Sequence, residues 1–227
     1  VSMTDLGRRQ GGDQVIPRPA AFWVRPDNPW RLLDVSPLRS TQTVIERVRR
    51  FTTTLDQLPP PPQSRPSAVL VPIIEGSEGP EIVLTRRTKH LSSHKGEVSF
   101  PGGRLDGNES FVEAAIREAR EEIGLDPNTV DVIGEMSAMA TYVSRSYIVP
   151  VVAHVTKRPS LDVRNDEVDR VFTVPLAELV RQDTYSEEHW GLPPHQYRIH
   201  FFHLDEETVW GVTGRMLHQL INIALSN

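Results

Sequence analysis

Residues 102–125 read GGRLDGNESFVEAAIREAREEIGL, and this stretch decides the fold. A pair of glycines opens it, and residues 117–122, near its end, read R-E-A-R-E-E. Three glutamates therefore occupy five consecutive positions. Carboxylates this close repel one another unless solvent or a cation offsets their charge. The stretch predicts either a solvated acidic surface or a cation site.

The spacing of the apolar residues predicts a helix over residues 110–123. At about 100° of rotation per residue, the apolar side chains fall on one arc and the three glutamates on the adjoining arc. We expect Asp106 or Asn108 to cap the start of this helix and Gly124 to end it. The buried arc is predicted to hold Val112, Ala115, Ile116, Ala119 and Ile123, and the acidic arc Glu118, Glu121 and Glu122.

Two features favour a cation site over a solvated acidic face. The glutamates lie toward the helix C-terminus, where the helix dipole disfavours anions by a few tenths of a kcal/mol each, roughly. Arg117, four residues from both Glu113 and Glu121, can offset only part of that cost. Clustered carboxylate oxygens are also the ligands that Mg²⁺ and Mn²⁺ prefer.

The composition limits the classes of function. The chain has 227 residues, 38% hydrophobic and 24% charged, with a net charge of -5 and no cysteine. Disulfides, thiol catalysis and thiolate metal sites are thereby excluded. Residues 1–66 carry ten basic against six acidic residues, and the remainder 15 against 24. An acidic body argues against a nucleic-acid partner. Because no apolar run is long enough for a membrane span, we expect a cytoplasmic protein without a membrane partner.

The chain is predicted to divide just after four consecutive prolines at positions 59–62. Residues 1–66 are predicted to form an irregular arm over 1–36, one helix starting at Ser40 or Thr41, and a proline-rich linker. Residues 67–227 are predicted to form the main domain. The strands expected there cover 67–74, 81–87, 96–103, 130–138, 146–155 and 197–204, with helices at 110–123, 173–180 and 211–226. Such a pattern indicates an α/β or α+β sandwich.

The quoted stretch resembles the Nudix box, G-x5-E-x7-R-E-U-x-E-E-x-G-U with U aliphatic. Reading from Gly103, five residues lead to Glu109 and seven more to Arg117, after which every fixed position matches. Ala119 is a small occupant of the first aliphatic position. The resemblance implies a diphosphate hydrolase on a Nudix-type α/β/α sandwich with a mixed sheet, using Mg²⁺ or Mn²⁺, with residues 1–66 as an N-terminal extension.

The same resemblance implies roles for individual residues. Glu118 and Glu122 would be the main metal ligands, with Glu121 as a further ligand or an aid to the attacking water. A backbone carbonyl at Gly102 or Gly103 would complete the coordination. Arg117 would pair with Glu109 and hold the loop against the helix. The general base stays open among Glu118, Glu121 and a later acid, Glu167.

A second resemblance concerns the substrate. Residues 84–106, LTRRTKHLSSHKGEVSFPGGRLD, resemble the signature of coenzyme A pyrophosphatases, and residues 209–217, VWGVTGRML, are similar to the segment that opens their last helix. Ser92 and Thr88 depart from that signature, where arginine and serine stand. The segment between Asp106 and Arg117 is also one residue shorter. Arg87, His94 and Arg104 are the implied substrate-binding residues.

Alternative readings accompany these implications. A hydrolase of ADP-ribose or another nucleoside diphosphate-sugar is the second candidate, and a silent Nudix ligand sensor the third. His90 and His94 are either structural or contacts to phosphate, and Trp210 and Phe100 are expected in the core rather than under a nucleobase. The partner is a small-molecule diphosphate. A homodimer is one of the oligomeric states that stay open.

Overall fold

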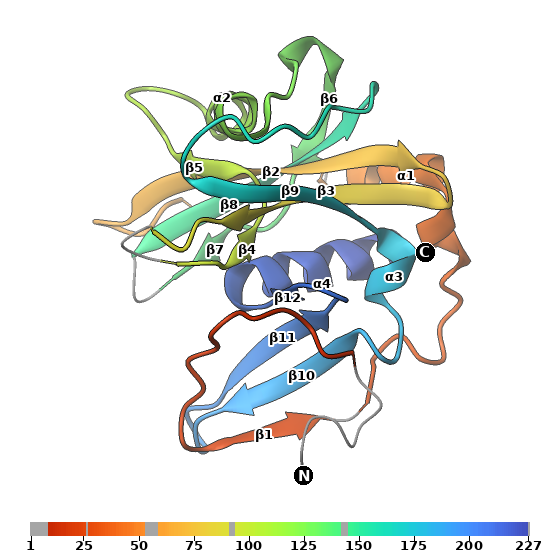
Figure 1. Cartoon of the computed structure of the whole chain (residues 1–227), viewed down its shortest axis with the longest axis vertical. Coiled ribbons are helices and arrows are strands. Elements are labelled where there is room, and N and C mark those ends of the chain that lie inside the picture. The colour runs from red at the N-terminus through yellow and green to blue at the C-terminus, as the bar shows by residue number, and fades with distance from the viewer. Residues whose placement is uncertain (1–8, 26, 53–58, 91–93, 142–144, 227) are drawn as a thin grey trace.

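The computed structural model describes residues 9–25, 27–52, 59–90, 94–141 and 145–226, and Figure 1 shows their arrangement. Within these ranges the strands form one sheet of eight and one of four. The helices lie on both faces of the larger sheet. The elements are β1 (Phe22–Arg25), α1 (Thr41–Thr52), β2 (Arg65–Gly76), β3 (Gly79–Arg87), β4 (Val98–Ser99), β5 (Gly102–Arg104), α2 (Phe111–Ile123), β6 (Val130–Glu135), β7 (Met139–Ala140), β8 (Ser146–Val155), β9 (Val168–Pro175), α3 (Leu176–Leu179), β10 (Tyr185–Trp190), β11 (Tyr197–His203), β12 (Thr208–Val209) and α4 (Gly211–Leu225), with 3₁₀ turns at Ser36–Arg39 and Pro127–Thr129.

The large sheet is mixed and centred on β2. Its order is β4-β3-β2-β8-β6, with β5 on β2, β7 on β8 and β9 on β3. β2 and β8 run parallel along ten paired residues, and the other pairs are antiparallel. β3 and β5 each pair with only part of β2. Residues 102 and 103 therefore pair with the edge of β2 opposite to β8, at the other end of the strand from β3.

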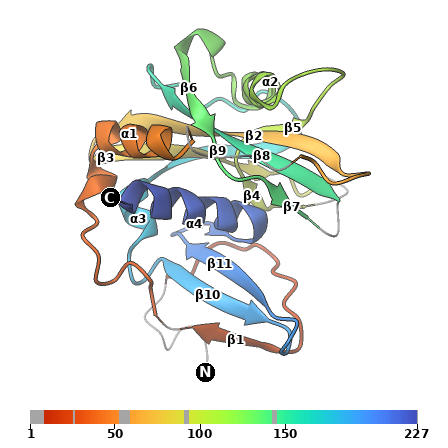
Figure 2. The ribbon, with the colours of Figure 1, turned by 180° about the vertical axis from the view of Figure 1, so that it is seen from behind.

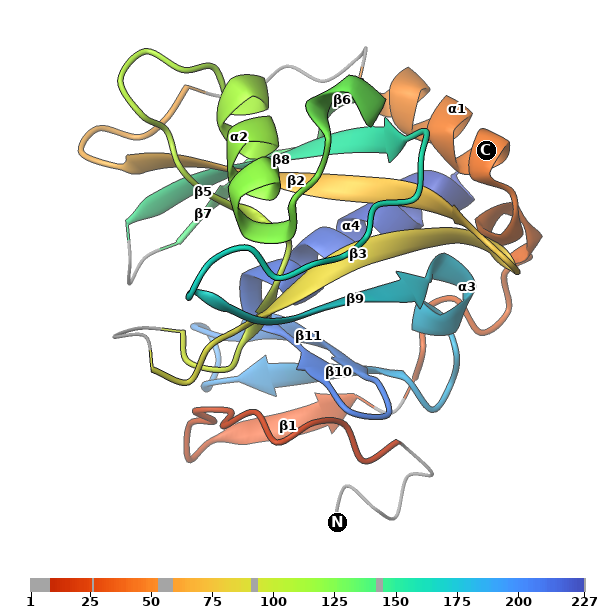
Figure 3. The ribbon, with the colours of Figure 1, turned by 45° about the horizontal axis from the view of Figure 1, so that its top comes forward.

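Helix α2 covers one face of the large sheet, as Figure 3 shows. Its alanines Ala114, Ala115 and Ala119 are fully buried against strand residues such as Leu70 and Val151. These small side chains let the helix lie close to the strands. The predicted apolar face is therefore the buried one, although Val112 and Ile116 are only partly buried.

Helices α1 and α4 cover the opposite face, and Figure 2 shows α4 between the two sheets. Leu217, Leu220 and Ile221 of α4 are fully buried in the larger core cluster, together with Val44 and Val48 of α1. With α2 on one side and these two helices on the other, the predicted α/β/α sandwich with a mixed sheet is confirmed.

The small sheet has the order β1-β10-β11-β12. β1 lies within residues 1–36, which were expected to be irregular, and it pairs with β10 from Phe22↔Trp190 to Arg25↔Glu187. Residues 9–18, here called the strap, run across the same sheet, and in Figure 1 they form the dark red trace in front of it. Division of the chain at residues 66 and 67 stays a prediction.

Most predicted elements are present, and the differences have identifiable causes. α1 starts at Thr41 as predicted, and the end of its predicted range lies outside the described residues. The short helix expected over 173–180 is only α3, because β9 continues to Pro175. β10 is missing from the prediction because its sequence, YSEEHW, carries two glutamates that read as exposed. No helix among the described residues is long and apolar enough to cross a membrane.

Candidate active site

The start of α2 is fixed by a capping box. Ser110 accepts a hydrogen bond from the Glu113 N–H, and the Glu113 side chain accepts one from the Ser110 N–H. The prediction that Asp106 or Asn108 caps the helix is wrong, because the loop enters the helix one turn later. Gly124 ends the helix as predicted, in the left-handed region at φ 65°. Both ends of the glutamate-bearing helix are thus defined locally.

Strand β5 brings a glycine directly under the helix. A Cβ at Gly103 would lie 2.4 Å from the Glu118 Oε1, closer than any side chain could approach. The absence of a side chain therefore lets the Glu118 carboxylate rest on the backbone of β5. The predicted juxtaposition of the glycine turn and the first glutamate is present in the structure.

Glu122 is the most buried carboxylate of this helix. Its residue is only 4% exposed, and its Oε2 accepts a hydrogen bond of 3.1 Å from the Gly102 N–H. Burial raises the pKa of Glu122 to about 7, against the lowering effect of the Gly102 N–H. The neighbouring charges of Glu118 and Glu167 raise it further, and that of Arg87 lowers it. Glu122 is an incompletely neutralised buried acid.

Glu118 lies beside Glu122 and is less deeply buried. Its Oε1 accepts a hydrogen bond of 2.9 Å from Arg117 Nη1. Burial raises the pKa of Glu118 above its ordinary value, and Arg117 lowers it in part. Glu118 and Glu122 are neighbouring carboxylates of α2 with raised pKa values. Such a pair is suited to binding a cation from solution.

Arg117 links the helix to the preceding loop. It donates to both oxygens of Glu109, at 2.8 and 3.1 Å, and to the Arg104 carbonyl at 3.0 Å. These hydrogen bonds lower the pKa of Glu109 and raise that of Arg117. The guanidinium therefore holds Glu109, the end of β5 and Glu118 together.

Glu121 does not join the other two glutamates. Its side chain is 56% exposed and lies 3.4 Å from Arg117 Nη1. Across the described ranges, no group of three or more acidic, histidine or cysteine side chains is arranged to hold a metal ion. The structure thus brings together Glu118, Glu122 and Gly103, and leaves Glu121 at the edge facing solvent.

Arg87 and Glu167 form an ion pair whose charges act on this acidic pair. Arg87, the last residue of β3, donates a hydrogen bond of 2.9 Å to Glu167. The Arg87 Nε is buried and has no hydrogen-bond partner among the described residues. Glu167 is 54% exposed and its charge acts on both Glu118 and Glu122. An arginine and an exposed carboxylate therefore face the buried acids.

The other residues singled out in the sequence are either exposed or packed in the core. The His94 side chain is 58% exposed and pairs with Glu97 at 2.8 Å, and the Arg104 side chain is exposed. His90 is also exposed. Phe100 is buried in the core as expected, and Trp210 is half-buried and stacks on Phe201. Ser92 of the coenzyme A signature lies outside the described residues.

Sequence reasoning missed two contacts around the site. The Gly102 N–H binds Glu122, whereas only a glycine carbonyl had been considered. Arg86, next to Arg87, binds Asp13 of the strap. The Gly-Gly pair was a signal for the first contact, since it exposes backbone groups; no local signal pointed to the second.

Comparison with known proteins now decides the family. The family model described as NUDIX domain matches residues 64–196. The chain belongs to the Nudix hydrolases. Nudix hydrolases cleave diphosphate linkages in nucleoside diphosphate derivatives and generally use divalent metal ions. The match includes residues 102–122, which contain the glycine pair and the glutamates of α2, as well as Arg87 and Glu167.

Two sequence relatives of this Nudix hydrolase agree with that assignment. Nudix hydrolase NudL of Photorhabdus laumondii is 36% identical over 171 residues, which cover 72% of this chain and 90% of that protein. Nudix hydrolase 3 of Caenorhabditis elegans is 32% identical over 172 residues, covering 69% and 72%. A crystal structure of a MutT/nudix family protein from Enterococcus faecalis has a TM-score of 0.44 and 15% identity, covering 82% of this chain and 73% of that one.

Proposed function

We propose that this Nudix hydrolase cleaves the diphosphate linkage of coenzyme A or its thioesters, giving 3′,5′-ADP and 4′-phosphopantetheine, with Mg²⁺ or Mn²⁺. The observation that carries the chemistry is the buried Glu122 beside Glu118 at the Gly102–Gly103 backbone. The support for the substrate is the resemblance of residues 84–106 to the coenzyme A pyrophosphatase signature.

The donor set fits a hard divalent ion. Glu122 is 4% exposed, and one backbone N–H is the only hydrogen-bond donor that the described residues offer it. A buried carboxylate with so little compensation is destabilising when ionised unless a cation binds it. Glu118, Glu122 and a backbone oxygen at Gly103 would hold the ion, and Glu121 would join only through a change of side-chain rotamer.

A bound divalent ion supplies charge neutralisation of the diphosphate and acidifies a bound water molecule. The chain's own residues must keep its ligands in place. Arg117 does so by binding Glu118 and Glu109 together, because one guanidinium fixes both the helix and the loop. Gly103 contributes by leaving room for the Glu118 carboxylate.

Glu167 is the best candidate for the base that removes a proton from the attacking water. Of the three acids considered, Glu118 is held by Arg117 in the ligand position, and Glu121 faces solvent beside the same arginine. Glu167 is exposed to water and interacts with both buried acids. Arg87 orients it through a hydrogen bond of 2.9 Å and brings a positive charge to the same part of the site.

A diphosphate panel in ¹⁸O-labelled water tests this proposal by mass spectrometry. Coenzyme A, acetyl-coenzyme A, ADP-ribose and a dinucleoside polyphosphate are each incubated with the chain and Mg²⁺ or Mn²⁺. We expect coenzyme A to give both products, one of them carrying a single ¹⁸O atom that identifies the phosphorus attacked. Intact coenzyme A together with AMP from ADP-ribose would support the second candidate instead.

A further inference from the structure

One carboxylate of the strap, that of Asp13, contacts two basic side chains close to Arg87 in the sequence. Arg86, near the end of β3, and Lys89, two residues beyond that end, both bind it; the Lys89 Nζ lies 2.7 Å from Asp13 Oδ2. We propose that Asp13 is a positioning residue for the substrate-binding end of β3. This inference rests on the proposed function of Arg87 and extends the active site to a segment outside the NUDIX match.

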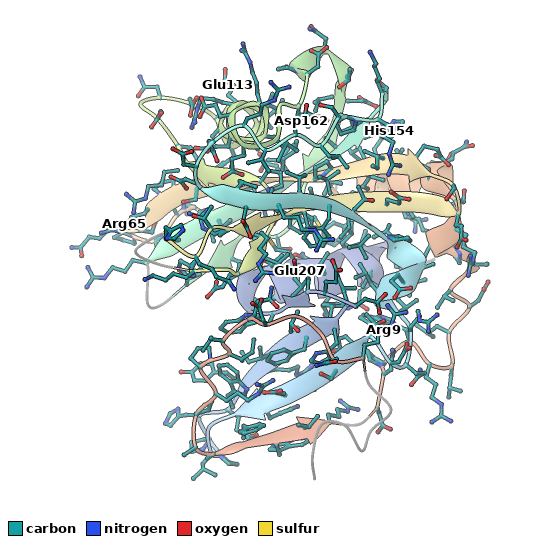
Figure 4. All side chains as sticks on the ribbon, in the orientation of Figure 1. Arg9, Arg65, Glu113, His154, Asp162 and Glu207 are labelled. Carbon is teal, nitrogen blue, oxygen red and sulfur yellow. The ribbon has the colours of Figure 1, made fainter. Side chains whose placement is uncertain are left out.

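The strap is anchored independently of Asp13. The Gly12 N–H donates to Thr208 Oγ1 at 3.1 Å, and the Gln14 side chain accepts from the Thr208 N–H at 2.9 Å while donating to Glu207. A Cβ at Gly12 would lie 2.4 Å from the Glu206 carbonyl oxygen, so the backbones touch. In Figure 4, Glu207 lies between this segment and the strands above it. Asp13 is thus held between two fixed neighbours.

Arg86 connects the anchored strap to strand β3 of the large sheet. Its side chain is only 13% exposed, and its Nη1 lies 3.3 Å from the buried Glu207, to which Gln14 also binds. The strap, the β11–β12 connection and β3 therefore share one network of charges. Its most exposed acid, Asp13, has a pKa lowered to about 2 by the hydrogen bonds from Lys89 and Arg86.

Successive residues of β3 point to opposite faces, so Arg86 and Arg87 divide the two tasks. Arg86 faces the strap, whereas Arg87 binds Glu167 and acts on Glu122. The pairing of β3 with β9 shifts register between these two arginines. The unpaired residue at this shift is Asp169 of β9, so the neighbouring strand is irregular beside Arg87 and the pairing there restrains the arginine less than a continuous ladder would.

The backbone around Arg87 joins both flanks of the site. The Arg87 N–H donates to the Glu97 carbonyl at 2.9 Å and the Thr88 N–H to the Glu167 carbonyl at 2.8 Å. A Cβ at Gly96 would lie 3.8 Å from Lys89 and 3.9 Å from Arg86, so the returning chain packs on both side chains. Loosening Arg86 and Lys89 would therefore disturb Arg87, Glu167 and residues 94–97 together.

Asp13→Asn and Asp169→Asn form a matched pair for testing this. Both acids flank Arg86 and their side chains are almost equally exposed, at 58% and 57%, but Asp169 lies 3.9 Å from Arg86 and belongs to β9. For Asp13→Asn we expect KM to rise about fivefold with kcat within about twofold, the size of one well-placed ion pair. Asp13→Glu should restore KM, and Asp169→Asn should leave it unchanged.

Hydrogen exchange provides a readout that does not depend on turnover. The amides of Arg87 and Thr88 should exchange faster in Asp13→Asn than in Asp169→Asn, with equal melting temperatures. Unchanged KM and exchange would reduce the Asp13 contacts to a surface ion pair. A lower KM would mean that Asp13 competes with substrate anions for Arg86 and Lys89. Either result overturns the proposal.

The choice of substrate does not affect this test. The kinetic comparison is made with coenzyme A, or with ADP-ribose if the unmodified chain cleaves only that. In the second case the proposed substrate fails, while the ratio of KM values between the variants still reports on Asp13. A change in KM without faster amide exchange would also contradict positioning through the backbone.

Discussion

Buried acids on the two sides of the large sheet are compensated in opposite ways. On the small sheet, Glu188 receives three hydrogen bonds from Arg18 and one from Trp190, and Glu207 is bound by Arg86, Arg170 and Gln14. On α2, Glu122 is similarly buried but receives a single backbone hydrogen bond among the described residues. A carboxylate compensated within the chain stabilises the fold, whereas an uncompensated one is available to a ligand.

The largest expected effect comes from removing the uncompensated charge. Glu122→Gln should lower kcat/KM by at least about 10³-fold, because a neutral amide cannot replace a charged metal ligand. The amide oxygen can still accept from the Gly102 N–H. Without divalent ions at pH 8, the melting temperature should rise, since the folded pKa is raised to about 7 and the ionised acid opposes folding above the ordinary pKa.

Glu121→Gln is the control for that variant. It lies one residue away on the same helix, but its side chain is mostly exposed, so activity should fall less than about tenfold. Equal losses of activity in the two variants would contradict the prediction that the buried glutamate matters more to the reaction than the exposed one.

The second effect comes from unbalancing a compensated acid. Arg18→Met should lower the free energy of unfolding by about 3 kcal/mol, because Glu188, 1% exposed, would lose its cationic partner and keep its charge with the Trp190 hydrogen bond. Urea denaturation measures this change. Arg18→Met combined with Glu188→Gln should recover most of the loss. If the single variant is as stable as the unmodified chain, the two sides of the sheet do not differ as described.

A third effect concerns histidines buried beside the small sheet. Burial lowers the pKa of His200 to about 3 and also lowers that of His218, on which it stacks at 3.9 Å. Below about pH 6.5 the unfolded chain binds protons that the folded chain does not. Stability should therefore fall with decreasing pH by up to about 1.4 kcal/mol per unit for His200, and His218 adds to the fall in the same direction. Groups acting on His200 are His189, Arg198, Arg215 and His218, and Glu187 acts on His218.

Urea midpoints at pH 5 and pH 7 test this dependence. His200→Gln keeps an acceptor for the Tyr185 hydroxyl and should flatten the slope, whereas the same change at the exposed His195 should not. An unchanged slope in His200→Gln would assign the pH dependence to other groups.

The smallest effect is expected at the start of α2. Ser110→Ala should reduce the free energy of unfolding by about 1 kcal/mol through loss of the cap. Because Arg117 still ties the helix to Glu109, KM should change little. Asn108→Ala is the control, since Asn108 was an alternative cap in the sequence. Thermal unfolding of the two variants distinguishes them, and a larger loss in Asn108→Ala would contradict the capping assignment.

The sequence predicts those parts of the site that depend on residues close together in the chain. The helix, its end at Gly124 and the meeting of Glu118 with Gly103 follow from periodicity and fixed spacing within residues 102–125. The exposure of Glu121 does not follow, because helical geometry alone puts it on the same arc as Glu118. Its final position depends on Arg117, which has several acids within reach.

The small sheet was harder to predict because its strands break the usual pattern. β10 buries Glu187 and Glu188. Glu188 is bound by Arg18 of the strap, 170 positions away, whereas His189 and Trp190, which bind Glu187 and Glu188, belong to β10 itself. No local pattern distinguishes such acids from exposed ones. The choice of Ser110 over Asp106 or Asn108 is similar, since all three residue types cap helices and only the path of the loop selects among them.

The hydrogen bond from Gly12 to Thr208 joins residues 196 positions apart. During synthesis on a ribosome, β1 and the strap must wait for nearly all the remaining chain before their partners exist. Such distant pairing closes late and slows folding. The nascent chain would therefore keep the edge of β1 without its partner strand until residues 185–190 have been synthesised.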